Sequence, residues 1–249
     1  FTLPPGLTAT KTGPAMMHIG EWGTFVIAIQ NASEADAHNA TIFDVLPNDA
    51  TGGMCDTTPE ILSARVFESD GVTTVPGKGP LSQGSDYSLS WNGFACQLVV
   101  NTLSAAAVIG VAERLILDYR TQLDTDTQDG AALTNVAGAI AWETEDGSTL
   151  YRRTLTDGTL GTGDHEDAHT VAVDLPDLRF EKTVMNVTTG EYPATIATQR
   201  DTLRYRLYVE NLSNVTVSDF SIVDELDAIN ADPSFVPGSL NVVSLPAGA

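Results

Sequence analysis

Leu7-Thr8-Ala9-Thr10-Lys11-Thr12 has the alternation of a β-strand that begins at an apolar residue. Because alternate side chains of a strand point to the same face, Lys11 is expected to point into a core together with the apolar residues of the stretch. The chain has three lysines and nine arginines, and Lys182 lies in the similar stretch 178–183. Two of the three lysines therefore share one structural position, which calls for a chemical explanation.

Short alternating segments recur along the chain, separated by turns rich in Gly, Pro, Asp and Asn. They are residues 24–30, 40–47, 61–67, 87–91, 97–103, 114–123, 131–142, 150–155 and 170–175. Only 104–111, with three alanines, suggests a helical turn. Strands at this spacing with almost no helical periodicity predict an all-β antiparallel sandwich.

The pattern starts again in the second half of the chain. Lys11 returns 171 residues later as Lys182, and segments 25–31 and 42–44 return 180 residues later. Repetition at this length indicates tandem domains rather than a solenoid. We expect a linker over 1–6, a first sandwich domain over 7–175, and a second, incomplete repeat over 176–249.

Composition limits the partners of the chain. The 249 residues carry a net charge of −21, with a pI near 4.2, so nucleic acid and anionic membranes would be repelled. No run of eighteen apolar residues occurs, so no membrane contact is expected within this segment. The chain begins at Phe1 with no visible signal peptide, and we expect a mature chain or a segment of a longer one.

Cys55 and Cys96 are the two cysteines, and both lie in polar, turn-rich sequence. An even number in such loops predicts one disulfide and an oxidising compartment. Two buried free thiols are the alternative.

Three polar residues share inward phases on three expected strands: Lys11, Asp44 and Asn135. Burial favours the neutral forms of an amine and a carboxylic acid. A neutral amine beside the Asn135 carboxamide, with protonated Asp44 as acid and proton shuttle, can displace ammonia and form an isopeptide bond. Arginine would stay charged and could not react in this way. An unreacted inward salt bridge, capped by Asn135, is the alternative.

These residues stand in a recognisable order. Lys-Thr lies on the first strand, Gln-Asn closes the second, Ile-Phe-Asp-Val-Leu-Pro forms the third, and Leu-Thr-Asn-Val-Ala lies on a late strand. The order resembles the DUF11-like, isopeptide-forming repeats of bacterial surface and fimbrial adhesins, over 7–142 and in part over 178–249. The resemblance implies that 7–175 and the partial repeat 176–249 are tandem immunoglobulin-like domains, the first of them isopeptide-forming. It also implies that Lys11 is the amine, Asn135 the acceptor and Asp44 the catalytic acid. Lys182 and Asp224 are the second-repeat equivalents, and no late-strand Asn follows them.

The resemblance also implies a function: a structural or stalk segment of an extracellular, cell-surface adhesin or fibre. Its partners would be neighbouring repeats of the same chain and an unidentified surface receptor. Each bond forms once, so the chemistry is single-turnover and the protein is not an enzyme.

Two acidic stretches suggest metal sites. Asp124, Asp126 and Asp129 alternate before a glycine like the start of a calcium loop, although no Glu stands at the twelfth position. A solvated acidic turn is the alternative, and no other cofactor is indicated. His165 and His169 would lie on one face of a helix over 164–169, without the order of a zinc-protease motif.

Two other functions stay open at this point. The first is a carbohydrate- or protein-binding module that displays the loops 48–84 and 143–170, with Trp91, Trp142 and Tyr151 as candidate aromatic contacts. The second is a metal-dependent hydrolase that uses the region of His165.

Overall fold

The computed structural model describes residues 6–145, 147, 149–156, 164–175, 178–212, 216–217, 220–225 and 233–245. The chain divides into two compact units, residues 1–175 and 176–249. Nearly all of the regular structure is β, and the single turn of helix, η1, spans Ala105–Ala107. No described helix is long and apolar enough to cross a membrane.

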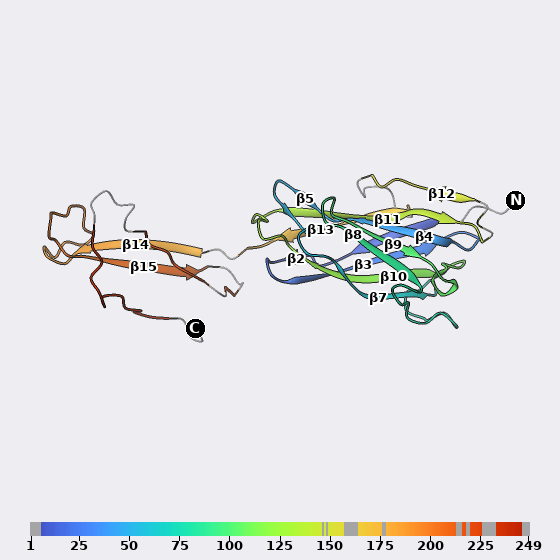
Figure 1. The fold of residues 1–249 in the computed structure, drawn as a ribbon, viewed down its shortest axis with the longest axis horizontal. Coiled ribbons are helices and arrows are strands. Elements are labelled where there is room, and N and C mark those ends of the chain that lie inside the picture. Colours follow the sequence, from blue (N-terminus) through green and yellow to red (C-terminus); the bar gives the residue numbers. More distant parts are fainter. Residues whose placement is uncertain are drawn as a thin grey trace. The chain divides into compact units, whose positions relative to one another are not determined.

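The first unit contains a four-stranded antiparallel sheet, sheet A (Figure 1). It is formed, in spatial order, by β1 (Leu7–Thr12), β3 (Trp22–Asn31), β10 (Arg114–Gln122) and β7 (Glu60–Phe67). Lys11 of β1 pairs with Ile27 of β3, which in turn pairs with Leu117 of β10. The first strand of the sequence is therefore an edge strand whose register is set by the central strand β3.

The second sheet of this unit, sheet B, is mostly antiparallel. Its spatial order is β2 (Met16–Met17), β13 (Glu166–Val173), β11 (Ala132–Glu143), β4 (His38–Val45), β9 (Gln97–Thr102) and β8 (Tyr87–Asn92), with β12 (Leu150–Arg152) on β11. Only the short β2 runs parallel to its neighbour, β13. A separate hairpin joins β5 (Asn48–Asp49) to β6 (Gly52–Gly53). Central β4 carries Asp44, and β11 carries Asn135.

The two sheets share one core. Alternation along β3 buries Phe25, Ile27 and Ile29, and alternation along β10 buries Leu115 and Leu117. These side chains and those of sheet B form a single cluster, and each large apolar side chain contributes roughly 1.5–3 kcal/mol when buried. The predicted all-β, immunoglobulin-like sandwich is confirmed.

The free edge of β1 is covered. The backbone N–H of Ala9 donates to the carbonyl oxygen of Asp164 at 2.7 Å, and that of Lys11 donates to Oδ2 of Asp167, also at 2.7 Å. Unpaired edge groups are a liability in β-proteins, and here they are used to hold the strand. The backbone position of Lys11 is thus fixed from both sides.

Cys55 and Cys96 form the predicted disulfide, with their Cα atoms 5.0 Å apart. It joins the segment after β6 to the turn between β8 and β9. Oδ1 of Asp124 accepts the backbone N–H of Cys55 at 2.7 Å and that of Asp56 at 2.8 Å, so the same segment is also tied to the end of β10.

Residues 164–169 do not form the helix on which His165 and His169 would share a face. Glu166–Val173 forms β13, which pairs with β11 from Gly138↔Glu166 to Ala132↔Ala172. Six residues do not establish a helix by themselves, whereas a long neighbouring strand offers a complete set of backbone hydrogen bonds.

The described residues of the second unit form one two-stranded antiparallel sheet. β14 (Leu178–Asn186) pairs with β15 (Leu203–Asn211), with Lys182 opposite Leu207. A lone hairpin buries little apolar surface, and Phe180 and Tyr208 are both about half exposed. That residues 176–249 are a second, incomplete repeat stays a prediction.

Candidate functional site

Lys11 and Asp44 meet inside the first unit. Nζ of Lys11, from sheet A, lies 2.7 Å from Oδ2 of Asp44, from sheet B, and the side chains are 0% and 1% exposed. Burying two charges costs several kcal/mol unless they are paired and well hydrogen-bonded. The alternation of β1 and β4 thus places a polar pair at the centre of an apolar core.

Asn135 lies beside this pair and is fully buried. Its neighbour on the same face of β11, Ala137, pairs with Asp44 of β4. Asn135 and Asp44 are therefore diagonal neighbours on the inner face of sheet B, which places their side chains within reach of each other. The structure brings together the three residues that the sequence singled out.

Tyr119 is a fourth member of the site. Its hydroxyl oxygen accepts a hydrogen bond from Lys11 Nζ at 3.1 Å and another from Asn135 Nδ2 at 2.7 Å. Its ring stacks on Phe25 with centroids 5.5 Å apart. The sequence shows Tyr119 in phase with Leu115 and Leu117, and the available signal was that a buried tyrosine hydroxyl needs a partner.

Burial dominates the electrostatics of the site. It lowers the pKa of Lys11, and the nearby Asp44 carboxylate only partly opposes this. Burial, with the Asp44 carboxylate as a second cause, raises the pKa of Tyr119 well above its ordinary value. The ring centroids of Phe25 and Tyr119 lie 5.6 and 5.1 Å from Lys11 Nζ. The site favours an uncharged amine beside an un-ionised phenol.

Two buried oxygens of the site lack hydrogen-bond partners within the described part of the chain. They are Oδ1 of Asp44 and Oδ1 of Asn135. An unsatisfied buried polar atom costs about 1–3 kcal/mol, so each of these two oxygens calls for an explanation. A proton on Asp44 would supply a donor to this pair of acceptors.

The second-repeat equivalents, Lys182 and Asp224, also form an ion pair. Their Nζ–Oδ1 distance is 2.7 Å, but the side chains are 34% and 28% exposed. The ring centroid of Tyr205 lies 4.8 Å from Lys182 Nζ. In the repeat, Tyr205 occupies the sequence position equivalent to Phe25. The second unit reproduces the amine and carboxylate without the burial.

In the acidic loop that contains Asp124, Asp126 and Asp129, the side chain of Asp124 points inward. Asp124 is buried and binds backbone N–H groups, and burial raises its pKa despite these bonds. Oδ1 of Asp129 accepts the N–H of Leu175 at 2.9 Å. No three His, Cys, Asp or Glu side chains are placed to hold a metal among the described residues. Calcium at Asp124, Asp126 and Asp129 stays a prediction without support from this geometry.

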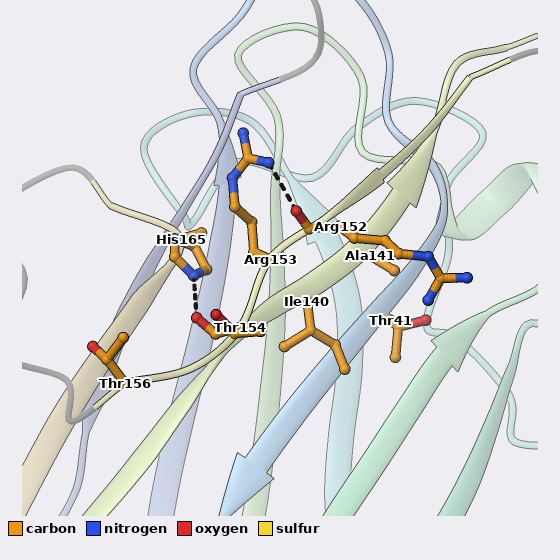
Figure 2. A pocket seen from close by; sticks show the side chains of 8 residues that line it. All are labelled: Thr41, Ile140, Ala141, Arg152, Arg153, Thr154, Thr156 and His165. Carbon is orange, nitrogen blue, oxygen red and sulfur yellow. Dashed lines mark hydrogen bonds between the residues drawn. The ribbon is translucent and has the colours of Figure 1, made fainter.

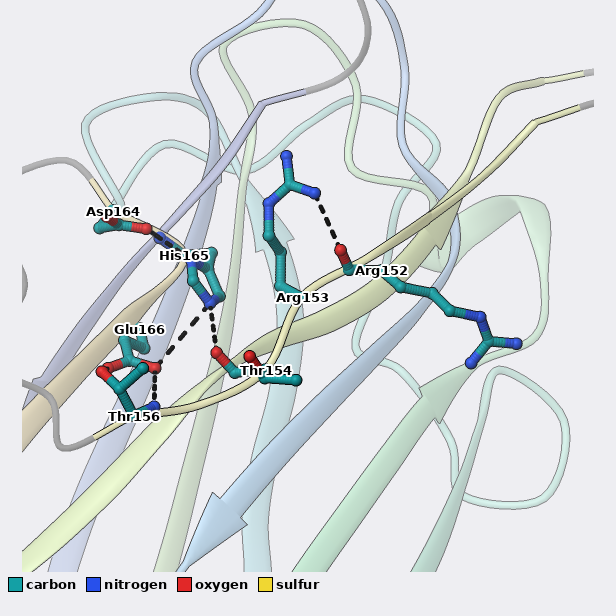
Figure 3. Close-up of polar contacts among 7 residues, drawn as sticks. All are labelled: Arg152, Arg153, Thr154, Thr156, Asp164, His165 and Glu166. Atoms are coloured by element: carbon teal, nitrogen blue, oxygen red, sulfur yellow. Dashed lines mark hydrogen bonds and ion pairs between the residues drawn. The ribbon is translucent and has the colours of Figure 1, made fainter.

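His165 and His169 do not converge on a metal site. His165 Nδ1 lies 2.5 Å from Asp164 Oδ1, and its Nε2 lies 3.0 Å from the carbonyl oxygen of Thr154 (Figure 3). His169 Nε2 lies 2.9 Å from the carbonyl oxygen of Pro14. Among the described residues both rings contact local groups, so the alternative of a metal-dependent hydrolase gains no support from this geometry.

An open hollow of about 600 Å³ lies on the outer side of sheet B. Figure 2 shows its lining: Thr41, Ile140, Ala141, Arg152, Arg153, Thr154, Thr156 and His165. Arg153 is held by a hydrogen bond from Nη1 to the carbonyl oxygen of Arg152 at 2.8 Å and lies 5.4 Å from the ring of Trp142. Neither arginine has a carboxylate partner among the described residues.

The fold and its interior define a class: an immunoglobulin-like sandwich that buries a lysine, an aspartate, an asparagine and a tyrosine together. No protein-family model and no curated protein matches the sequence.

Similar solved structures include the collagen-binding domain of a Staphylococcus aureus adhesin, at 13% identity and a TM-score of 0.36, covering 66% of this chain and 97% of that one. The major pilin subunit BcpA of Bacillus cereus has 8% identity and a TM-score of 0.42, with 83% and 55% covered. The major pilin SpaD of Corynebacterium diphtheriae has 11% identity and a TM-score of 0.41, with 82% and 48% covered. The chain thus spans about half the length of these pilins, and the likeness carries no argument on function.

Proposed function

We propose that this chain is a structural segment of an extracellular bacterial adhesin or fibre, hardened by an isopeptide bond between Lys11 and Asn135. The observation that carries the proposal is the cluster itself: the amine and the amide both bond to the Tyr119 hydroxyl, and Asp44 lies 2.7 Å from the amine. The bond forms once, so the protein is its own single-turnover substrate rather than an enzyme.

The chemistry follows from the burial of the pair. Transfer of a proton from Lys11 to Asp44 gives a neutral amine and a neutral acid, the forms that a dry interior favours. The amine nitrogen attacks Cγ of Asn135 while Asp44 donates a proton to Oδ1, where negative charge develops. Collapse of the tetrahedral intermediate releases ammonia and leaves an amide between the two sheets.

A mechanical role follows from the topology. The bond would join the first strand of the unit to β11, closing a loop of more than a hundred residues. On the entropy model for cross-links, such a loop constrains the unfolded chain by roughly 4–5 kcal/mol. Tension along the chain would then pass through covalent bonds, which suits a stalk built from neighbouring repeats on a cell surface.

Intact-mass measurement of the denatured, reduced chain tests the proposal. We expect the mass to fall short of the sequence mass by one ammonia only, because reduction of the disulfide restores its two hydrogens. Lys11→Ala, Asp44→Ala and Asn135→Ala should each restore the full mass expected for the variant. Lys182→Ala is the matched control, because its amine is partly exposed, and it should keep the deficit. A full-mass wild-type chain would rule out the bond.

The hollow of Figure 2 favours a second candidate function, that of a ligand-binding module. Arg152 and Arg153 form no ion pair with a carboxylate among the described residues, and a guanidinium is suited to bind a carboxylate on a sugar. The net charge of −21 disfavours a polyanion, so the ligand would carry a single acidic group. Titration with a singly carboxylated sugar, followed by calorimetry, should show binding that Arg153→Ala abolishes. The neutral sugar is the control, and equal binding of both sugars would exclude this site.

A further inference from the structure

The hydroxyl oxygen of Tyr119 is shared by the two nitrogens that the proposed reaction exchanges. It accepts from Lys11 Nζ at 3.1 Å and from Asn135 Nδ2 at 2.7 Å. One nitrogen must form a bond to Cγ of Asn135, and the other must leave it. The ring is fully buried and stacks on Phe25, so the oxygen is held between the two groups.

The reaction requires two proton movements at these nitrogens. When the amine attacks, its nitrogen must lose a proton to become an amide. When the C–N bond of the carboxamide breaks, its nitrogen must gain a proton to leave as ammonia. A hydroxyl group can accept one proton while donating its own, and proton transfer by a positioned group accelerates reactions by about 10²–10⁴-fold.

We propose that Tyr119 is the proton relay of the cross-linking reaction, taking a proton from the Lys11 nitrogen and giving its own to the departing Asn135 nitrogen. This inference rests on the proposed function. The bond between Lys11 Nζ and Asn135 Cγ forms, the bond between Cγ and Nδ2 breaks, and ammonia leaves. Tyr119 ends as it began, an intact phenol, and no oxidation or reduction takes place.

The surroundings of Tyr119 favour a phenol that stays un-ionised while it relays protons. Burial raises the pKa of Tyr119, so the phenol holds its proton and moves protons in pairs rather than storing a charge. Asp44 bonds to the amine through Oδ2, its carboxylate also interacts with the Tyr119 hydroxyl, and its Oδ1 has no hydrogen bond that meets normal geometry among the described residues. This oxygen is then available to the amide carbonyl, and the two residues divide the work: Asp44 serves the oxygen, and Tyr119 serves the two nitrogens.

Tyr119→Phe is the direct variant, because it removes the hydroxyl and keeps the ring on Phe25. The wild type and the variant are made by cell-free synthesis, quenched in acid at intervals and weighed intact. We expect the wild type to lose ammonia and Tyr119→Phe to do so about a hundredfold more slowly or more. Urea unfolding of Lys11→Met with and without Tyr119→Phe, where neither chain can react, shows whether the variant folds.

Two measurements that respond to proton transfer distinguish a relay from a residue that only positions the reacting groups. Site-specific 3-fluorotyrosine at position 119 changes the acidity of the phenol while the ring stays in place, so the rate should shift, and the wild-type rate should fall in heavy water. These two measurements also decide the matter if Tyr119→Phe fails to fold. A rate unchanged by fluorination and heavy water, or equal rates for wild type and Tyr119→Phe, would overturn the relay and leave the cross-link standing. A wild type that keeps its ammonia would overturn both.

Discussion

Lys11 and Asp44 lie on opposite sheets with their charged atoms 2.7 Å apart, and solvent reaches neither side chain. In the exposed pair of Arg120 and Glu60 the distance is 2.6 Å, but the side chains are 38% and 49% exposed. The two pairs have the same geometry and differ in burial. This difference determines both the chemistry available to the amine and the cost of disrupting each pair.

Asp44→Ala should destabilise the first unit far more than Glu60→Ala. Removing one partner of a buried pair leaves an uncompensated charge and costs about 3–5 kcal/mol, whereas an exposed pair contributes about 0–1 kcal/mol. Both changes are made in an Asn135→Ala background, so that no cross-link adds to the difference. The free energy of unfolding in urea measures each cost.

A second change checks the cause of the Asp44→Ala loss. Adding Lys11→Met removes the stranded amine and should recover part of the lost stability, since an apolar pair of similar volume often replaces a buried ion pair without loss. No recovery would mean that the cost of Asp44→Ala came from the cavity rather than from the charge.

The disulfide should stabilise the same unit independently of the Lys11 site. Cys55 and Cys96 are 41 residues apart in sequence, and closing a loop of that length contributes about 4 kcal/mol on the entropy model. Cys55→Ser with Cys96→Ser should lower the free energy of unfolding by about 2–4 kcal/mol. The ammonia deficit should persist, since neither cysteine touches the site, and its loss would show that the disulfide is needed to assemble it.

The sequence predicted the inward face of the site well because β-strands alternate strictly. Lys11 is buried by the alternation of a six-residue strand, and Asn135 by the same alternation along β11. The alternation of a strand predicts which side chains are buried, but it does not predict which residues they contact. The phase that Tyr119 shares with Leu115 and Leu117 places it in the core, but only the facing of sheet A and sheet B brings its hydroxyl to Lys11 and Asn135.

Where local pattern competed with long-range pairing, the sequence was less informative. His165 and His169 have the spacing of one helical face, but residues from Glu166 onward pair with the edge of β11 and form a strand. Asp124 has the spacing of a calcium ligand, but the backbone N–H groups of Cys55 and Asp56 turn it inward. In both cases a partner distant in sequence supplies hydrogen bonds that the local spacing does not reveal, and calcium binding by this loop stays a prediction.

The buried amine predicts a pH dependence of stability when the bond is blocked. In Asn135→Ala, burial keeps the pKa of Lys11 below its ordinary value, while the unfolded chain has the ordinary value of about 10.4. Between these two values the unfolded chain binds more protons, so stability rises with pH. The slope can reach about 1.4 kcal/mol per pH unit.

Urea unfolding at pH 8 to 10.5 (about the span over which lysine titrates) measures this slope. The control carries Lys11→Met and Asp44→Leu in addition, and it lacks both buried charges. Asn135→Ala should gain stability relative to the control as the pH rises toward the ordinary lysine value. A constant difference between the two chains would show that the Lys11 pKa is the same in the folded and unfolded states.

Gly138 tests how closely the site depends on the packing of β13 against β11. A Cβ added at Gly138 would lie 2.3 Å from the carbonyl oxygen of His165 and 2.8 Å from Cα of Glu166. Both atoms belong to the backbone, so β13 would have to move, at a cost of about 1–3 kcal/mol. Asn135 lies three residues away on the same strand, and its displacement from Tyr119 should slow the loss of ammonia, because small misplacements cost about 10²-fold in rate.

Gly79→Ala is the matched control for this change. A Cβ at Gly79 meets no atom within 4 Å, and its backbone is outside the left-handed region. The substitution should leave the rate of ammonia loss unchanged and the free energy of unfolding equal or slightly higher. If Gly138→Ala matched this control in both urea unfolding and intact-mass time courses, β13 would have to be loosely packed on β11. The close approach of the two strands could then not be what holds Asn135 against Tyr119.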